Sequence, residues 1–238
     1  MLAEHFGGYL PVVVDVTDAL EFGKENLIAV WADNSNDPNY PPGKQQEVLD
    51  FTYFGGIYRD CWLIAHNQVF ITDPNYENEE AGGGLFVAYN NVSDHSAEVL
   101  LKIQIRNSGR KAFKGVVEYE LQQPDGQQVA SLNSVIRIKP GKSTYSSDKL
   151  TVKSPMLWSP ENPALYNLII RIRDEKGNPI DGYRRRIGIR SIEFKGEDGF
   201  WLNGKPYEAP LIGATGTRIS QLWAMRYLTV FTGGMPKS

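Results

Sequence analysis

Alternating apolar and polar residues, separated by turn signals, fill the second half of this 238-residue chain and limit what it can fold into. Turns at 124–126 and 139–142 have a physical basis, because proline presets φ and glycine accepts a positive φ. Seven short strands without a helical period predict an all-β, immunoglobulin-like sandwich. The expected strands are 85–91, 97–108, 115–122, 129–139, 149–153, 166–174 and 182–188.

The composition is that of a globular protein that can bury a core, with 41% hydrophobic and 22% charged residues. The formal net charge of -3 gives no electrostatic reason to expect nucleic acid or an anionic membrane as a partner. No stretch approaches 18 consecutive apolar residues, and the first residues lack the features of a signal peptide. We therefore expect no nucleic acid and no membrane partner.

Cysteine and histidine give little indication of chemistry. The single cysteine, Cys61, excludes an intrachain disulfide. Because it lies in an alternating strand pattern, we expect a small core residue and not a nucleophile. His5, His66 and His95 lie far apart without metal-ligand spacing, so we expect structural or surface roles.

The first 65 residues contain fewer strand signals. Residues 7–20 predict a strand and then a turn with Thr17 or Asp18 as its cap, and residues 26–32 predict a second strand. So few strands do not close a sandwich. We therefore expect an incomplete first domain with exposed edges.

An aromatic-rich stretch, 47–63, follows a polar loop at 33–46. Paired glycines allow backbone angles that other residues avoid, so a bend is expected at Gly55 and Gly56. A further strand should then occupy 57–64.

Several motifs follow one another in a fixed order, and together they resemble glycoside hydrolase family 2, the β-galactosidase and β-glucuronidase group. The resemblance covers residues 5–214. Its motifs are Asp50 with Gly-Gly-Ile-Tyr-Arg-Asp at 55–60, Leu-Trp-Ser-Pro-Glu-Asn-Pro-Ala-Leu-Tyr at 157–166, Gly-Ile-Arg-Ser-Ile at 188–192 and Phe-Trp-Leu-Asn-Gly-Lys-Pro at 200–206.

The resemblance implies four segments. Residues 1–67 would be the C-terminal part of a sugar-binding jelly-roll (galactose-binding-like) domain, and residues 68–190 the immunoglobulin-like sandwich. Residues 191–214 would be the start of a truncated (β/α)8 (TIM) barrel, followed by an irregular tail at 215–238.

The tail departs from the family, which continues Asn-Arg-His after the Gly-Ala of 213–214, whereas this chain reads Thr-Gly-Thr. If one base is added to a possible coding sequence for residues 214–219, the translated sequence reads Ala-Asn-Arg-His, as in the family. We therefore expect a frameshifted tail, with a divergent native tail as the alternative.

The family hydrolyses β-galactosides and related O-glycosides with retention, using two glutamates on late barrel strands that this chain lacks. The resemblance thus implies a non-catalytic fragment of a carbohydrate-metabolising glycosidase, inactive alone. Asp73, Glu79 and Glu80 lie on turn-rich segments, where we expect nothing to hold them opposite one another.

Site residues come from the resemblance. Asp50 stands where related β-galactosidases place an aspartate that holds a galactosyl hydroxyl and a monovalent cation, which suits carboxylate oxygens. Magnesium and sodium ions are implied for the parent enzyme, and no cofactor is expected for this chain. Arg59 and Asp60 are expected to form a buried or interdomain pair. The other motif residues expected to be structural are Gly55, Gly56, Trp158, Pro160, Tyr166, Asn203 and Gly204.

Two other functions stay open. One is a stand-alone carbohydrate-binding module of two sandwiches, in which Trp62 and the Asn-Tyr-Pro-Pro of 39–42 supply an aromatic platform. The other is a subunit that complements a separate barrel chain or joins an oligomer. The compartment is not indicated, and the parent enzyme would be cytoplasmic or periplasmic.

Overall fold

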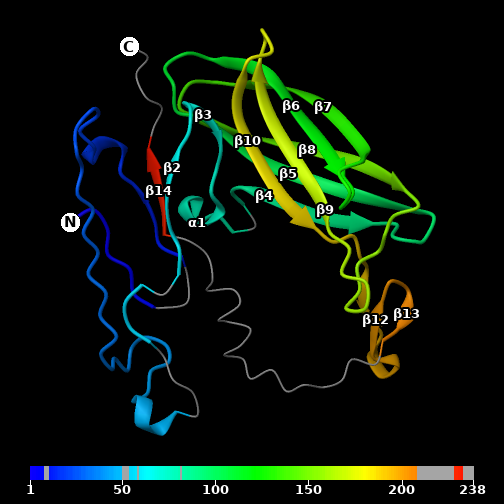
Figure 1. Cartoon of the computed structure of the whole chain (residues 1–238), viewed down its shortest axis with the longest axis horizontal. Coiled ribbons are helices and arrows are strands. Elements are labelled where there is room, and N and C mark those ends of the chain that lie inside the picture. The colour runs from blue at the N-terminus through cyan, green and yellow to red at the C-terminus, as the bar shows by residue number, and fades with distance from the viewer. Residues whose placement is uncertain (8–10, 50–53, 58, 81, 208–227, 233–238) are drawn as a thin grey trace. The chain divides into compact units, whose positions relative to one another are not determined.

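The computed structural model describes residues 1–7, 11–49, 54–57, 59–80, 82–207 and 228–232 (Figure 1). The chain divides into two compact units, residues 1–65 with 212–238 and residues 66–211. Strands are the main regular structure, with 44% strand against 7% helix, which confirms the expected all-β fold class.

The second unit contains two antiparallel sheets (Figure 1). In the first sheet, the central strand β5 (Ser96–Asn107) pairs with β8 (Lys142–Lys153) on one side and with β4 (Leu85–Asn90) and β3 (Val69–Ile71) on the other. The second sheet has the order β10-β9-β6-β7. These strands are Pro179–Ile187, Tyr166–Asp174, Phe113–Gln122 and Gln128–Ile138.

The chain passes between the two sheets after β5, β7 and β8, so the unit is an immunoglobulin-like sandwich. Side chains alternate along each strand, and one set from each sheet meets in the core. On β9, for example, Leu168, Ile170 and Ile172 are fully buried. The core is completed mainly by Val99, Leu101, Ile103 and Ile105 of β5 with Val117, Tyr119 and Leu121 of β6.

All seven expected strands of the sandwich are present, and β8 is longer than predicted. It begins at Lys142 rather than 149, because the turn at 139–142 leads directly from β7 into β8. The polar residues 143–148 belong to a strand whose inward positions alternate with solvent-facing ones.

The first unit differs from expectation. Residues 26–32 form no strand, and β2 is limited to Cys61–Ala65. Cys61 is exposed, so the expectation of a core cysteine is wrong. The physical reason is the lack of a core here, since Val16 is the sole buried hydrophobic residue among those described in 1–65.

The N-terminal strand β1 (Val13–Asp15) leads into a 3₁₀ turn, η1 (Thr17–Ala19). The predicted cap is wrong, because the carboxylate of Asp15 accepts the backbone N–H of Thr17 at 2.9 Å. A second 3₁₀ turn, η2, spans Gln46–Val48.

The tail that we expected to be irregular contains strand β14 (Leu228–Thr232). This strand pairs in parallel with β1 and with β2.

A small antiparallel sheet follows the sandwich. It comprises β11 (Ile192–Phe194), β12 (Phe200–Leu202) and β13 (Lys205–Pro206), with a 3₁₀ turn, η3 (Gly196–Asp198). Asn203 and Gly204 have φ of 53° and 73°, as a tight hairpin turn requires, so the predicted hairpin is confirmed. Among the described residues, no helix is long and apolar enough to span a membrane.

Candidate functional site

The residue that the resemblance singled out for sugar and cation binding, Asp50, lies outside the described residues. Gly56 lies at a bend with a φ of 77°. Gly55 packs close to Asn34, since a Cβ at Gly55 would lie 2.6 Å from the Asn34 side chain. Arg59 and Asp60 are exposed in this structure, and the buried or interdomain pair that we expected between them stays a prediction.

No group of three or more His, Cys, Asp or Glu side chains is placed to hold a metal ion in the described parts of the chain. The predicted monovalent cation therefore depends on Asp50 alone and stays a prediction.

Two motifs that are distant in sequence meet at one end of the sandwich. The backbone N–H of Trp158 donates to the carbonyl of Ile189 at 2.8 Å, and the guanidinium of Arg190 lies 5.2 Å from the Trp158 ring centre. Gly188 is required beside this ring, because a Cβ there would lie 2.9 Å from Trp158 Cγ. The tryptophan thus packs against residues 188–190, which follow β10 where the chain leaves the sandwich.

The remaining motif residues stabilise the same end. Tyr166 is fully buried at the start of β9, and its hydroxyl accepts the backbone N–H of Met156 at 2.8 Å. Pro160 lies exposed in a turn closed by a hydrogen bond from Ser159 N to Asn162 O at 3.0 Å. These contacts position the 157–166 segment and bring no pair of reactive groups together.

Asn203 joins the small sheet to this segment. Its side-chain oxygen accepts the N–H of Ser191 at 3.1 Å, and its side-chain nitrogen donates to the carbonyl of Trp158 at 3.0 Å. Beyond the hairpin, the hydroxyl of Tyr207 donates to Glu161 at 2.7 Å, and this hydrogen bond lowers the pKa of Glu161. The motifs at 157–166, 188–192 and 200–206 thus form one junction.

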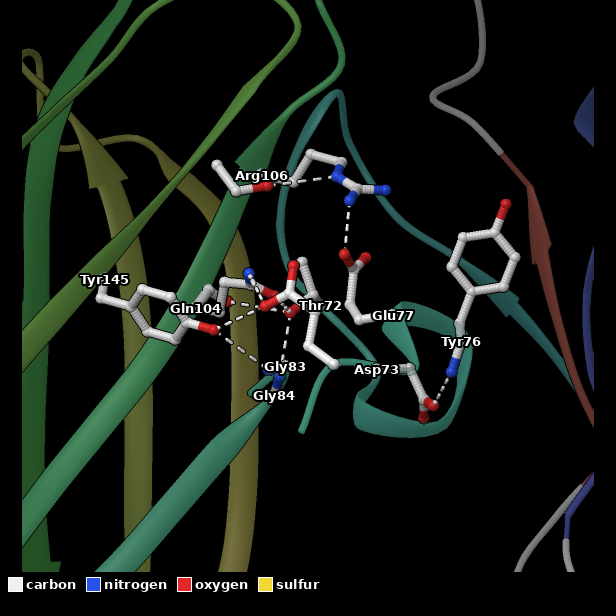
Figure 2. Close-up of polar contacts among 11 residues, drawn as sticks. Thr72, Asp73, Tyr76, Glu77, Gly83, Gly84, Gln104, Arg106 and Tyr145 are labelled. Atoms are coloured by element: carbon white, nitrogen blue, oxygen red, sulfur yellow. Dashed lines mark hydrogen bonds and ion pairs between the residues drawn. The ribbon is translucent and has the colours of Figure 1, made fainter. Parts of the chain in front are cut away.

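A second polar cluster lies beneath the loop 72–84 and was not predicted (Figure 2). The hydroxyl of Thr72 donates to Gln104 Oε1 at 2.7 Å and accepts the N–H of Gly84 at 2.9 Å. Gln104 Nε2 donates to Glu79 at 3.1 Å, and the hydroxyl of Tyr145 donates to the same carboxylate oxygen at 2.9 Å. The loop is thus bound to the middle of β5 and β8 by a connected network.

Local chemistry shapes the loop above this network. The carboxylate of Asp73 accepts the N–H groups of Asn75 and Tyr76 at 2.8 and 3.1 Å and caps a short helix, α1 (Pro74–Glu77) (Figure 2). At Gly84, a Cβ would lie 2.6 Å from Pro74 Cδ, so the close approach of the two segments needs glycine.

Glu77 forms an ion pair with Arg106 of β5 at the same loop (Figure 2). The Glu77 side chain is 3% exposed, and its other oxygen has no hydrogen-bond partner among the described residues. Burial raises the pKa of Glu77, while the charge of Arg106 opposes that rise.

Glu79 is therefore held by Gln104 and Tyr145, while the expectation that nothing holds the acidic residues of this loop opposite one another stays a prediction. Thr72, Glu79, Gln104 and Tyr145 come from separate parts of the sequence, and only the pairing of β5 with its neighbours brings them together. The Asp-Pro pair at 73–74 is typical of a helix start, and it is the one sequence signal near this cluster that local reasoning could have used.

The two antiparallel sheets place the chain among all-β proteins with an immunoglobulin-like sandwich. The motifs at 157–166, 188–192 and 200–206 meet at one end of this sandwich. Residues 84–190, from β4 to the end of β10, match the glycosyl hydrolases family 2. The family match and the relatives described next show that the chain belongs to this family.

Individual relatives agree with this assignment. The chain is 30% identical over 227 residues to a β-glucuronidase of Formosa agariphila, covering 94% of this chain and 22% of the relative. It is 30% identical over 206 residues to a β-galactosidase of Thermoanaerobacter pseudethanolicus, covering 86% and 25%. The crystal structure of a Bacteroides uniformis β-glucuronidase superposes with a TM-score of 0.59 at 28% identity, covering 74% and 20%. The chain thus spans about a quarter of the length of the curated relatives it matches.

Proposed function

We propose that this chain is a non-catalytic supporting segment of a retaining β-glycosidase of the β-galactosidase type. The observation that carries the proposal is that three glutamates on the strands of the matched sandwich are held by basic side chains. Glu118 and Glu120 each accept a hydrogen bond from an arginine of β9, and Glu98 accepts one from Lys149 of β8.

Retaining hydrolysis needs two carboxyl groups about 5–5.5 Å apart, one ionised as nucleophile and one protonated as acid. The hydrogen bond from Arg171 lowers the pKa of Glu120, and that from Lys149 lowers the pKa of Glu98. A lowered pKa keeps these groups ionised and unsuited to donate a proton near neutral pH. Glu77 has a raised pKa, but its buried side chain is closed to a sugar.

The family and its relatives support the proposed substrate class. The matched relatives are named β-glucuronidases and β-galactosidases. We propose a β-galactoside for the complete enzyme, with Asp50 holding a sugar hydroxyl and a monovalent cation. A carboxylate can fill both roles through its two oxygens.

The purified chain should be incubated with chromogenic β-galactoside and β-glucuronide substrates. We expect no release of chromophore above the blank, because Glu98, Glu118 and Glu120 of the sandwich are each held by a basic side chain. A heat-denatured sample of the same preparation is the control for contaminating glycosidase. Turnover that follows the purified chain through two chromatographic steps would overturn the proposal.

The frameshift proposed for the tail is tested by the nucleotide sequence around codon 214. One restored base should reopen a long reading frame that continues the family pattern. If each single-base restoration meets a stop codon within a few residues, the tail is native.

A carbohydrate-binding role is the alternative that specific side chains favour. Tyr40 is 37% exposed and stacks on Phe6 with ring centres 4.7 Å apart, and Trp62 is 49% exposed. Exposed rings of this kind bind sugar faces. Retardation of the chain in gels that contain neutral polysaccharide, abolished by Tyr40→Ala, would support this function.

A further inference from the structure

The outer face of the β10-β9-β6-β7 sheet, whose four strands are labelled in Figure 1, carries a row of basic side chains. We define the basic stripe as Arg184 and Arg186 of β10, Arg171 and Arg173 of β9, Lys114 of β6 and Arg137 of β7.

Strand register places all six on the same face. On β9, Ile170 and Ile172 are fully buried, so the alternating Arg171 and Arg173 point away from the core. Arg184 pairs with Ile169, the outward residue before Arg171. Lys114 pairs with Arg137 at the opposite edge.

The stripe runs diagonally across the sheet. It begins at Arg186 on the edge strand β10, crosses β9, and ends at Arg137 on the other edge, β7. Alternate residues of one strand are roughly 7 Å apart, and neighbouring strands are roughly 5 Å apart. Successive cations are therefore close enough to repel one another and to be contacted by one extended ligand.

Only part of this charge is neutralised by the protein. Arg171 and Arg173 pair with Glu120 and Glu118 at 2.7 and 2.8 Å, and Lys114 pairs with Glu175. The other three members of the stripe form no ion pair among the described residues. Arg184 donates to the neutral amide of Asn167 at 3.0 Å.

Six cations against three carboxylates leave an excess of three positive charges on this face, although the whole chain has a formal charge of -3. Like charges on adjacent positions destabilise a sheet. The excess positive charge on one face points to a partner that supplies the missing negative charge.

We propose that the basic stripe binds a polysaccharide that carries carboxylates, namely a uronic-acid polymer. The planar guanidinium of arginine matches a carboxylate in a two-point hydrogen bond, and five of the six members of the stripe are arginines. Neutral polar side chains on the same face, Gln122, Ser131, Asn133 and Asn167, suit the hydroxyl groups of a sugar.

The outward positions disfavour other polyanions. Single-stranded nucleic acid is bound by aromatic rings that stack on bases, and the outward positions of β6, β7, β9 and β10 between residues 114 and 186 carry no aromatic ring. The proposed binding is separate from the hydrolytic role above, because it requires no cleavage and none of the catalytic carboxylates.

Binding of the whole chain to polygalacturonate should be measured by affinity gel electrophoresis and by titration calorimetry at low and high salt. Fully methyl-esterified polygalacturonate, which has the same backbone without charge, is the matched ligand. We expect binding to the acid form only, weakening as salt rises.

The test variant is Arg184→Ala with Arg186→Ala, which removes two exposed cations without breaking an ion pair. We expect an affinity loss of about tenfold, as for the loss of charge-assisted contacts. The control is Lys102→Ala with Lys153→Ala, two exposed cations on strands of the other sheet, and should bind like the wild type. Unchanged thermal unfolding of both variants shows that the fold is retained.

Four results would overturn the proposal, and three of them are comparisons. They are equal binding of the methyl ester, an equal loss of affinity in the control variant, and tighter binding of a single-stranded oligonucleotide of the same charge at the same salt. No detectable binding to polygalacturonate at low salt would overturn it as well.

Discussion

Among single residues, Thr72 has a buried hydroxyl that makes hydrogen bonds to two other segments of the sandwich. It is 3% exposed, donates to Gln104 and accepts from the backbone N–H of Gly84. Valine has the same shape without the hydroxyl, so Thr72→Val leaves a buried amide oxygen and a buried N–H unpaired.

We expect Thr72→Val to lower the free energy of unfolding by about 1–3 kcal/mol, the usual cost of unsatisfied buried polar groups. Urea unfolding monitored by fluorescence measures it. The matched control is Thr151→Val on the exposed side of β8, which should change stability by less than about 0.5 kcal/mol. Equal effects of the two substitutions would contradict the role of the network.

Glu120 makes stability depend on pH. The hydrogen bond from Arg171 lowers the pKa of Glu120 in the folded chain, so the folded state favours the ionised form. A lowered folded pKa adds stability above the unfolded value, about 4.3 for glutamate, and this stability is lost as the pH falls through the folded value. We therefore expect the free energy of unfolding to fall more steeply below about pH 5 in the wild type than in Glu120→Gln. Parallel curves for the two proteins would disprove this contribution.

At the scale of elements, the β12–β13 hairpin depends on Asn203 for two separate reasons. The residue has a positive φ of 53°, and its side chain bonds to Ser191 and Trp158. Asn203→Gly keeps the backbone freedom and loses the side-chain contacts, whereas Asn203→Ala loses the contacts and adds left-handed strain.

Both substitutions should destabilise the junction, and Asn203→Ala should cost about 1 kcal/mol more than Asn203→Gly because of the strained φ. Thermal unfolding of the three proteins under one set of conditions compares them. Equal stability of the alanine and glycine variants would show that the backbone angle does not matter here.

At the scale of the whole molecule, the two units differ in how much they bury. The hydrophobic core extends from Val69 to Ile189 and lies entirely in the second unit, whereas Val16 is the one buried hydrophobic residue described in 1–65. Burial of apolar surface is the main favourable term in folding. Most of the stability of the chain therefore belongs to the sandwich.

We expect residues 66–207, expressed alone, to unfold in one cooperative transition, while residues 1–65 alone show none. Circular dichroism during thermal unfolding tests both fragments. Ile170→Ala in the larger fragment should lower its stability by about 2–5 kcal/mol, because Ile170 is fully buried. A cooperative transition in residues 1–65 would show that this part has a core of its own.

Features that depend on a few neighbouring residues were predicted correctly from the sequence, and features that depend on distant segments were not. The strands of the sandwich and the Asn203-Gly204 hairpin were predicted correctly, because alternation and turn chemistry act over a few residues. Strand expectations failed at 26–32, and Cys61 proved exposed, because burial depends on what covers a strand and not on its pattern.

The amino-acid sequence by itself determined the fold class, the positions of the sandwich strands and, through its ordered motifs, the family. Tertiary structure alone decided which polar groups meet, such as Glu79 with Tyr145 or Asn203 with Trp158, and which basic residues share a face. The physical reason is strand register, since shifting a pairing by one residue would move each side chain to the opposite face of its sheet.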